Sequence, residues 1–221
     1  GRGERLLPIT KKLPKPLVKI AKKPIIEHII ENAKKHGFRK FIISVNYLAS
    51  SFKIYFNEKK IKELDIKLEF LEEKEPLGTG GSLGMIKKKI SKPIVVSNGD
   101  ILSNINFTSL INSHIQKKSS ATMVVNNYTH EHPFGVVKTK GSKILNIIEK
   151  PKNNTKINAG VYVLSPEILN KKYVKNHINM TNIFLSLIKS NKKVNAFPLH
   201  ESWSDIGNIK DLKQAKKNLN E

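Results

Sequence analysis

Cysteine is absent from the 221-residue sequence, which excludes disulfide bonds and zinc sites built on thiolates. The absence fits a reducing compartment, and we expect a cytoplasmic protein. No apolar run approaches the roughly 20 residues that a membrane-spanning helix needs, and no signal peptide is visible. We therefore predict no membrane partner, and the length suffices for one sizeable α/β domain over residues 1–221.

Acidic residues are scarce: 18 Asp and Glu stand against 40 Lys and Arg, a formal net charge of +22. Such an excess favours polyanionic partners, among them nucleotides, nucleic acid and acidic surfaces. The lysines, however, fall in pairs spread along the chain, at residues 11–12, 34–35, 117–118 and 192–193. A dedicated nucleic-acid surface would be clustered and interleaved with aromatic or arginine side chains. We attribute the charge to a compositional bias towards lysine and predict no nucleic-acid partner.

Apolar periodicity in the first 126 residues predicts helices and strands in alternation. The helices are expected at residues 24–33, 48–56 and 107–116, and the strands at 41–45, 67–72, 93–97 and 121–126. A Gly-rich segment, residues 77–82, is expected to open into a further helix that reaches about residue 89. Alternation at this spacing predicts a parallel sheet with helices on both faces.

The pattern changes in the second half of the chain. A hairpin is expected from residues 134–139 and 143–148, and a further strand at 159–164. The remaining expected elements are a short helix capped by Ser165-Pro166-Glu167, a helix at 181–189, a strand at 193–198 and a closing helix at 208–219. Neither an internal repeat nor a second domain boundary is visible in the sequence.

The first 15 residues combine glycines with cations. A turn that contains Gly1 and Gly3 brings backbone N–H groups close to anionic oxygens, because no Cβ keeps the ligand away. Arg5 and Lys15 add two positive charges within one short loop, which suits a triphosphate. The same residue types are common in solvated turns, so this loop alone leaves both interpretations open.

Two aspartates follow predicted strands. Asp100 comes after the apolar strand 93–97, and Asp205 lies between the strand 193–198 and the closing helix. Ligands in open α/β sheets lie at the carboxyl ends of strands, and one or two carboxylates plus phosphate oxygens suit Mg²⁺. An aspartate there is equally often a helix cap or turn former. The two could share a metal only if the fold brings them together, which the sequence alone leaves open.

Polar residues near the predicted hairpin suit a sugar phosphate. Glu149 could bind sugar hydroxyls and Lys150 a phosphate, although an exposed charged turn is the simpler interpretation in a chain this rich in lysine. Asn158 lies beside Gly160, an arrangement that suits a polyol or a packed backbone. The histidines have no helical metal spacing and no clear Ser or Cys partner; they are His28, His36, His114, His130, His132, His177 and His200.

Eight motifs occur in one order and span nearly the whole chain. They are Gly-x-Gly-x-Arg-Leu-x-Pro-Ile-Thr, Pro-Lys-Pro-Leu, Pro-Leu-Gly-Thr-Gly-Gly, Asn-Gly-Asp, Phe-Gly-Val-Val, Glu-Lys-Pro, Asn-Ala-Gly and Trp-Ser-Asp-Ile-Gly. In this order they resemble the sugar-1-phosphate nucleotidyltransferases, the family of mannose-1-phosphate guanylyltransferase and glucose-1-phosphate thymidylyltransferase. Each motif alone is weak, but the ordered set is highly specific.

The resemblance implies the nucleotide-diphospho-sugar transferase fold, a Rossmann-like mixed, mainly parallel sheet with helices on both faces. It also implies a Mg²⁺-dependent reaction, in which a sugar-1-phosphate oxygen attacks the α-phosphorus of a nucleoside triphosphate and pyrophosphate leaves. The attacking oxygen is already anionic at neutral pH, so no strong general base is needed. The lack of a Ser/His or Cys/His pair is therefore expected.

The resemblance also implies roles for particular residues. The triphosphate would be bordered by Gly1, Gly3 and Arg5, and Lys15 would stabilise charge at the reacting phosphate. Asp100 and Asp205 would hold the metal, and Leu77 and Gly78 would contact the base. The residues implied to hold the sugar phosphate are Gly135, Glu149, Lys150, Asn158 and Gly160.

Glu73 lies where thymidylyltransferases that resemble this chain have a Gln. A carboxylate only accepts hydrogen bonds, and the Watson–Crick edge of guanine offers two adjacent donors, N1–H and N2–H. Thymine and uracil would present carbonyl oxygens as well as one N–H. We therefore expect GTP as the nucleotide, with an ordinary strand-end charge as the alternative interpretation of Glu73.

The start of the chain departs from the family pattern. Family members begin with an apolar strand that leads into Gly-Gly, whereas this sequence begins inside the loop that follows. That strand would lie mid-sheet, and its loss would be substantial against a total stability of roughly 5–15 kcal/mol. We expect a single domain truncated at its N-terminus that can form a homo-oligomer. The alternative is a catalytically idle paralogue or fragment with a binding or regulatory role.

Overall fold

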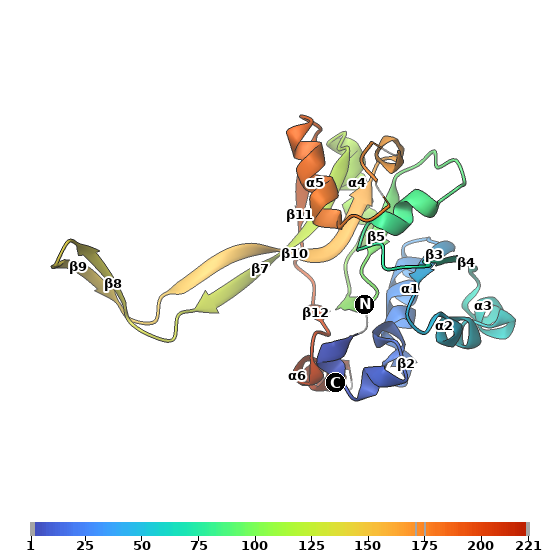
Figure 1. Cartoon of the computed structure of the whole chain (residues 1–221). Helices are drawn as coiled ribbons and strands as arrows, with labels where there is room; N and C mark the ends of the chain where they lie inside the picture. The colour runs from blue at the N-terminus through green and yellow to red at the C-terminus, as the bar shows by residue number, and fades with distance from the viewer. Residues whose placement is uncertain (1–2, 171, 175, 220–221) are drawn as a thin grey trace.

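The computed structural model describes residues 3–170, 172–174 and 176–219, and its centre is a four-stranded sheet (Figure 1). The strands lie in the order β11 (Val194–Pro198), β7 (Ala121–Glu131), β10 (Lys152–Leu164) and β5 (Ile94–Ser97). β7 pairs with β11 in parallel, whereas β10 pairs antiparallel with both β7 and β5. β5, β7 and β11 therefore run in one direction and only β10 opposes them, which confirms the predicted mixed, mainly parallel sheet.

Helices cover both faces of this sheet, because successive side chains of β10 point to opposite sides. Tyr162 and Leu164 pack in a cluster with α5 (Met180–Lys189). Val161 and Val163 pack in a second cluster with α4 (Phe107–Gln116). The helices expected at 107–116 and 181–189 are thus confirmed, as is their placement on both faces of the sheet.

A second, two-stranded sheet pairs β3 (Lys40–Val45) in parallel with β4 (Lys67–Glu72). It packs against α1 (Ile25–Lys35), α2 (Ala49–Tyr55) and α3 (Glu58–Leu64). Of the five elements of this unit, α3 is the one that the sequence does not predict. It begins after Asn57, whose side chain accepts a hydrogen bond from the backbone N–H of Lys60 at 2.9 Å. This capping signal is local, and the helix has only two apolar residues, Ile61 and Leu64, which are too few to show a period.

A buried carboxylate joins the three helices of this unit. Glu27 of α1 is 1% exposed, accepts a hydrogen bond from the Tyr55 hydroxyl and lies 2.9 Å from the Lys60 ammonium. Burial, together with the Glu27 carboxylate, raises the pKa of Tyr55 above its ordinary value. Because a buried charge without a partner is costly, this network fixes α2 and α3 against α1.

β3 and β5 each have one edge that pairs with no other strand in the described part of the chain. β3 pairs only with β4, and β5 pairs only with β10, so each leaves one row of backbone groups without a ladder. An additional apolar strand, as the resemblance implies, would find hydrogen-bonding groups at either edge. That such a strand precedes Gly1 stays a prediction.

The Gly-rich segment does not form the predicted helix to about Lys89. The structure has a short 3₁₀ turn there, η4 (Gly81–Met85), and then an irregular segment up to β5. Gly80, Gly81 and Gly84 raise the conformational entropy cost of a helix, and the following Lys87-Lys88-Lys89 places three like charges together. The prediction of a helix at this position is wrong.

The predicted hairpin is confirmed and forms the end of a long arm. β8 (Val136–Lys140) pairs antiparallel with β9 (Lys143–Ile148), and Figure 1 shows the pair projecting away from the rest of the molecule. β7 and β10 continue into the arm well beyond their predicted bounds, because polar residues extend their ladder without burial. The register places Val137, Ile144 and Ile147 on one face of the hairpin, and all three are exposed.

The remaining elements are short or peripheral. They are η1 (Glu4–Leu6), η2 (Ile9–Lys11), η3 (Lys15–Leu17), β1 (Lys19–Ile20), β2 (Lys23–Pro24), β6 (Ile101–Ser103), η5 (Pro166–Leu169), β12 (Trp203–Asp205) and α6 (Ile209–Leu219). Of these, η5 and α6 correspond to the predicted short helix and closing helix. Among the described residues, no helix combines the length and apolar character needed to cross a membrane.

One histidine does have a serine partner, contrary to expectation. His114 is 1% exposed, with Nδ1 2.8 Å from the Thr122 hydroxyl oxygen and Nε2 3.0 Å from that of Ser165. The Ser165 hydroxyl donates to the Ser119 carbonyl at 2.8 Å, so Nε2–H donates to Ser165 and Nδ1 accepts from Thr122. This neutral, buried ring connects α4 to β7 and to the residue that follows β10, and so has a structural role.

Stability should depend on His114 below neutral pH. Burial lowers the pKa of His114 from its ordinary 6.5, so the unfolded chain takes up a proton that the folded chain resists. The free energy of unfolding should therefore fall as the pH drops below about 6.5, by up to about 1.4 kcal/mol per unit of pKa difference. Urea unfolding at pH 7.5 and 5.5 should show a larger loss for the wild type than for His114→Gln, and equal losses would contradict this.

Candidate functional site

The site is built around a buried lysine. Lys15 is 8% exposed, and its Nζ lies 2.5 Å from Oδ2 of Asp100 and 3.5 Å from Oδ1 of Asp205. Three residues from distant parts of the chain thus converge on one point. The two predicted metal-binding aspartates, whose convergence the sequence left open, both reach the same cation.

A short antiparallel ladder brings the two aspartates together. Asp100 immediately precedes β6, Asp205 ends β12, and the register places Asp205 opposite Ile101. The backbone N–H of Ile206 also donates to the Asp100 carbonyl at 3.2 Å. Each strand has three residues, which is too short for a period-2 pattern to be read from the sequence. This long-range ladder is the part of the site that sequence reasoning missed.

The glycine loop packs directly on Lys15. Gly3 adopts φ +66°, and a Cβ on it would lie 3.3 Å from Cβ of Lys15 and 3.0 Å from Cγ2 of Thr10. The buried Thr10 hydroxyl donates to the Gly3 carbonyl at 2.7 Å and so holds the loop in this position. The structure thus gives Thr10, a member of the first motif without a predicted role, the function of a loop anchor. Gly1, the other predicted nucleotide contact, lies outside the described residues.

Arg5 lies beside the turn that follows Asp205. A Cβ on Gly207 would come 3.4 Å from Nη1 of Arg5, so the guanidinium sits against this backbone. Arg5 is exposed, and Gly207, against which its guanidinium lies, is two residues after Asp205. The two predicted catalytic cations, Arg5 and Lys15, thus both lie beside the segment 205–207.

Gly160 lies against the Asp100 turn, and Asn158 is hydrogen-bonded to it. The Asn98 N–H, two residues before Asp100, donates to the Gly160 carbonyl at 2.9 Å. Gly160 has φ +72°, and a Cβ there would collide with Ile101. The Asn158 amide accepts from the Gly160 N–H at 2.9 Å and donates to the Tyr162 hydroxyl at 2.7 Å. The sequence left two interpretations of this motif, a polyol site and a packed backbone. The contacts show that the backbone at Gly160 is closely packed.

The other predicted sugar-phosphate residues lie on the arm. Gly135 precedes β8, and Glu149 and Lys150 follow β9. A Cβ on Gly135 would come 2.8 Å from Oε2 of Glu149, so these two are neighbours. Figure 1 shows the arm directed away from β12 and the N-terminal segment. The structure thus separates this group from Lys15, Asp100 and Asp205.

Glu73, Leu77 and Gly78 form a third group, at the end of β4. One Glu73 carboxylate oxygen accepts the Leu77 N–H at 3.1 Å, and the other accepts the Ser44 hydroxyl. Gly78 has φ +76°, which favours glycine. The predicted base-reading carboxylate therefore also anchors the Gly-rich loop.

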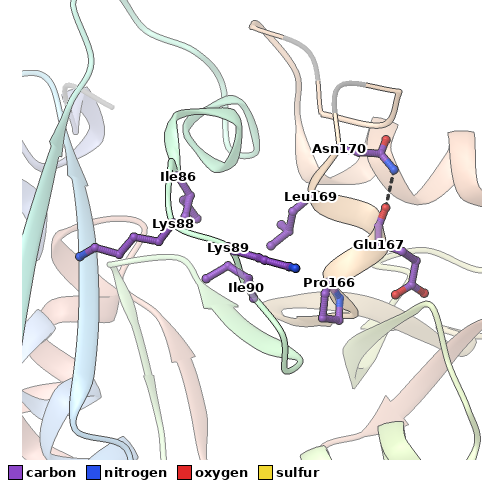
Figure 2. Close-up of a pocket in the computed structure, with 8 residues that line it drawn as sticks. All are labelled: Ile86, Lys88, Lys89, Ile90, Pro166, Glu167, Leu169 and Asn170. Atoms are coloured by element: carbon purple, nitrogen blue, oxygen red, sulfur yellow. Dashed lines mark hydrogen bonds between the residues drawn. The ribbon is translucent and has the colours of Figure 1, made fainter.

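A small cavity lies at the end of β5 opposite to Asp100 (Figure 2). Its volume is about 240 Å³, and its lining residues are Ile86, Lys88, Lys89, Ile90, Pro166, Glu167, Leu169 and Asn170. These residues precede β5 and follow β10, where Ile94 pairs with Leu164, whereas Asp100 follows the other end of β5. Ligand pockets typically measure about 300–1,000 Å³, and none of the predicted site residues lines this cavity.

The donor set at Lys15 suits a hard divalent cation. No group of three or more His, Asp or Glu residues capable of holding a metal is found among the residues that the structure describes. Asp100 and Asp205 supply two carboxylates, which is the number that Mg²⁺ commonly takes when phosphate oxygens complete its shell. The pair therefore fits a cation that is bound together with a nucleotide.

Comparison with known proteins connects this geometry to a family. The family model described as "Nucleotidyl transferase" matches residues 1–221. The mannose-1-phosphate guanylyltransferase catalytic subunit beta of Drosophila melanogaster is 35% identical over 220 residues, which cover 96% of this chain and 58% of that protein. The chain thus spans less than two thirds of the length of this relative.

Solved structures share the fold. HddC from Yersinia pseudotuberculosis, complexed with GMP-PN, is 25% identical with a TM-score of 0.71, and the match covers 97% of this chain and 94% of that one. UDP-glucose pyrophosphorylase from Acinetobacter baumanii is 19% identical with a TM-score of 0.73, covering 99% and 90% of the two chains. The second likeness concerns the fold alone.

The Lys15 cluster should behave as one energetic unit. Lys15→Met leaves two neighbouring carboxylates without their cation, and because these are partly solvated we expect a loss of about 1–3 kcal/mol in the free energy of unfolding. Adding Asp100→Asn should recover part of that loss, because it removes the repulsion. A double-mutant cycle by urea unfolding, followed through the fluorescence of the single tryptophan, measures the coupling. Strictly additive effects would contradict the cluster.

Proposed function

Because the chain belongs to the nucleotidyl transferase family, we propose that it transfers a nucleotidyl group from a nucleoside triphosphate to a sugar 1-phosphate. The observation that carries the proposal is the convergence of Lys15 with Asp100 and Asp205 beside the Gly3 loop. Two anionic phosphates repel each other, so a site that brings them together needs positive charge. Lys15, and a metal ion held by the two carboxylates at the carboxyl end of β5, would supply it. We propose that the reaction takes place in the cytoplasm.

The chemistry requires positioning and charge stabilisation. A bond forms between a phosphate oxygen of the sugar 1-phosphate and the α-phosphorus, while the bond from that phosphorus to the bridging oxygen breaks and pyrophosphate leaves. The nucleophile is already anionic, so no residue has to accept a proton. Lys15 would stabilise negative charge on the α-phosphate, and Arg5 with the Gly3 backbone would contact the other phosphates. The neutral, buried His114 therefore needs no part in the reaction.

Asp100 and Asp205 are the residues that would hold Mg²⁺. When bound, the ion would neutralise phosphate charge and orient the triphosphate. The chain's own residues prepare this site: the β6–β12 ladder fixes the two carboxylates, and Lys15 balances their charge. Gly99 lets the Asp100 turn approach, because a Cβ on it would lie 3.3 Å from Cγ of Pro16.

The sugar phosphate would bind beside the Asp100 turn. Gly160 already lies there, in contact with Asn98 and Ile101, and Asn158 accepts a hydrogen bond from the Gly160 N–H. Gly135, Glu149 and Lys150 are proposed to complete the sugar site, which requires the arm to bend towards the sheet. Relatives named for mannose 1-phosphate make this sugar phosphate the first one to test.

GTP is the proposed nucleotide. Glu73 uses one acceptor position on each oxygen for Leu77 and Ser44, which leaves further lone pairs for N1–H and N2–H of guanine. Relatives named as guanylyltransferases, and a similar structure complexed with GMP-PN, support this choice. Leu77 and Gly78 would form the rest of the base site.

Pyrophosphate release is the direct test of the activity. With Mg²⁺, GTP, dTTP, UTP and CTP should be crossed with mannose 1-phosphate and other sugar 1-phosphates, using this chain and a form with an apolar strand and Gly-Gly added before Gly1. We expect release with GTP, and a drop in kcat of at least about 100-fold for Lys15→Met, because a group that stabilises developing charge is removed.

The controls separate chemistry from folding. Lys213→Met replaces an exposed lysine of α6 in the same way and should leave kcat unchanged. Folded protein that releases no pyrophosphate in either form, from any nucleotide and sugar phosphate, would contradict the activity and favour an idle paralogue.

Glu73→Gln tests the choice of base. Gln replaces one acceptor with a donor, so the preference for GTP over dTTP, measured as the ratio of kcat/KM values in competition, should fall by about 10-fold. Glu72→Gln is the matched control, because Glu72 is the neighbouring strand residue and pairs with Lys53 at 2.7 Å. If the Glu73→Gln variant keeps the same preference for GTP, Glu73 does not select the base and serves only to hold the Gly-rich loop.

A further inference from the structure

The Gly-rich loop, residues 77–81, packs against the segment that leads into α5. The Ile178 N–H donates to the Leu77 carbonyl at 3.0 Å, and the Gly80 N–H donates to the Ile178 carbonyl at 2.9 Å. Two backbone hydrogen bonds therefore join segments about 100 residues apart. None of the motifs in the sequence includes the α5 side of this contact.

Two side chains complete the contact reciprocally. The Thr79 N–H donates to Oδ1 of Asn179 at 3.2 Å, and the Met180 N–H donates to the Thr79 hydroxyl at 2.9 Å. Asn179 occupies the N-cap position of α5 but makes no side-chain cap to its own helix. The free N–H groups of a first helical turn need acceptors, and the loop supplies one. We call Thr79 and Asn179 the loop clamp.

The close approach explains two of the glycines. A Cβ on Gly78 would lie 2.7 Å from the Ile178 carbonyl oxygen, and a Cβ on Gly81 would lie 2.6 Å from that of Asn176. Both distances are too short for any other residue without a backbone shift. The sequence associates this loop with a nucleotide, but its glycines are also required by packing on the α5 side.

Glu73 holds the same loop from the opposite side. Its carboxylate accepts the Leu77 N–H at 3.1 Å, immediately before Gly78. The Leu77–Gly78 backbone is thus held by β4 on one side and by the clamp on the other. Fixing a binding loop before the ligand arrives removes the ordering cost from the binding step and raises affinity.

We propose that Thr79 and Asn179 are positioning residues that hold Leu77 and Gly78 in place for the nucleotide. This role rests on the proposed function, in which the loop contacts the base. The clamp is separate from the elements that carry Lys15, Asp100 and Asp205, namely η3, β12 and the turn before β6. Its loss should therefore weaken nucleotide binding and raise KM for GTP, while kcat is retained.

The test compares disruptive with conservative variants of the full chain. Asn179→Ala and Thr79→Val each remove one acceptor, whereas Asn179→Asp and Thr79→Ser keep it. Asn182→Ala, at an exposed position of the same helix, is the matched control. We expect Kd for GTP by calorimetry, and KM for GTP, to rise about 3- to 10-fold in the disruptive variants, the range for one lost hydrogen bond. The conservative variants and the control should stay within 2-fold of the wild type, as should every kcat.

The outcomes distinguish this role from the proposed function. If the wild type binds GTP and the disruptive variants bind it equally well, the positioning role is overturned and the proposed function stands. A lower Tm with unchanged Kd and KM would likewise reduce the clamp to a helix cap and overturn the role. If the folded wild type binds no nucleoside triphosphate, the proposed function and the role fail together.

Discussion

A buried lysine held between two carboxylates is the interaction on which the rest of the site depends. Removing a charge from water is costly unless partners are close, so Lys15 is stable at this position only because Asp100 and Asp205 reach it. Those partners meet because β6 and β12 pair, and Gly99 gives the Asp100 turn room to lie close to Pro16. One charge pairing thus links the first, middle and last parts of the chain.

The three groups of predicted binding residues differ in how they are held. The Lys15 group is fixed by a sheet ladder, the Gly-rich loop by contacts to β4 and α5, and the arm residues only by a two-stranded hairpin. The residues proposed to bind the nucleotide therefore lie on elements packed against the rest of the molecule. Glu149 and Lys150 lie beside a hairpin whose two strands pair only with each other.

Much of the fold could be predicted from the sequence because its helices and strands bury one face. α1, α4 and α5 show apolar residues at helical spacing, β3 and β5 contain short apolar runs, and β4 begins with alternating polar and apolar residues. The failures have physical reasons: α3, β6 and β12 are too short to show a period, and the polar parts of β7 and β10 are formed by ladder bonds. The motifs identified Lys15, Asp100 and Asp205, but their convergence depends on a pairing between residues about 100 positions apart. Asn179 lay outside every motif, and no local signal marks its long-range contact with Thr79.

The exposed apolar face of the β8–β9 hairpin has a consequence for cooperativity. An isolated two-stranded hairpin is only marginally stable in water, and Val137, Ile144 and Ile147 gain little from burial where they are. Trp203, by contrast, packs against the core and donates its indole N–H to the Ala159 carbonyl at 3.0 Å. The arm can therefore open while the core stays folded, so one free energy of unfolding does not describe the whole chain. Amide hydrogens of the arm should exchange with solvent through such partial openings, long before the fluorescence of Trp203 registers any change.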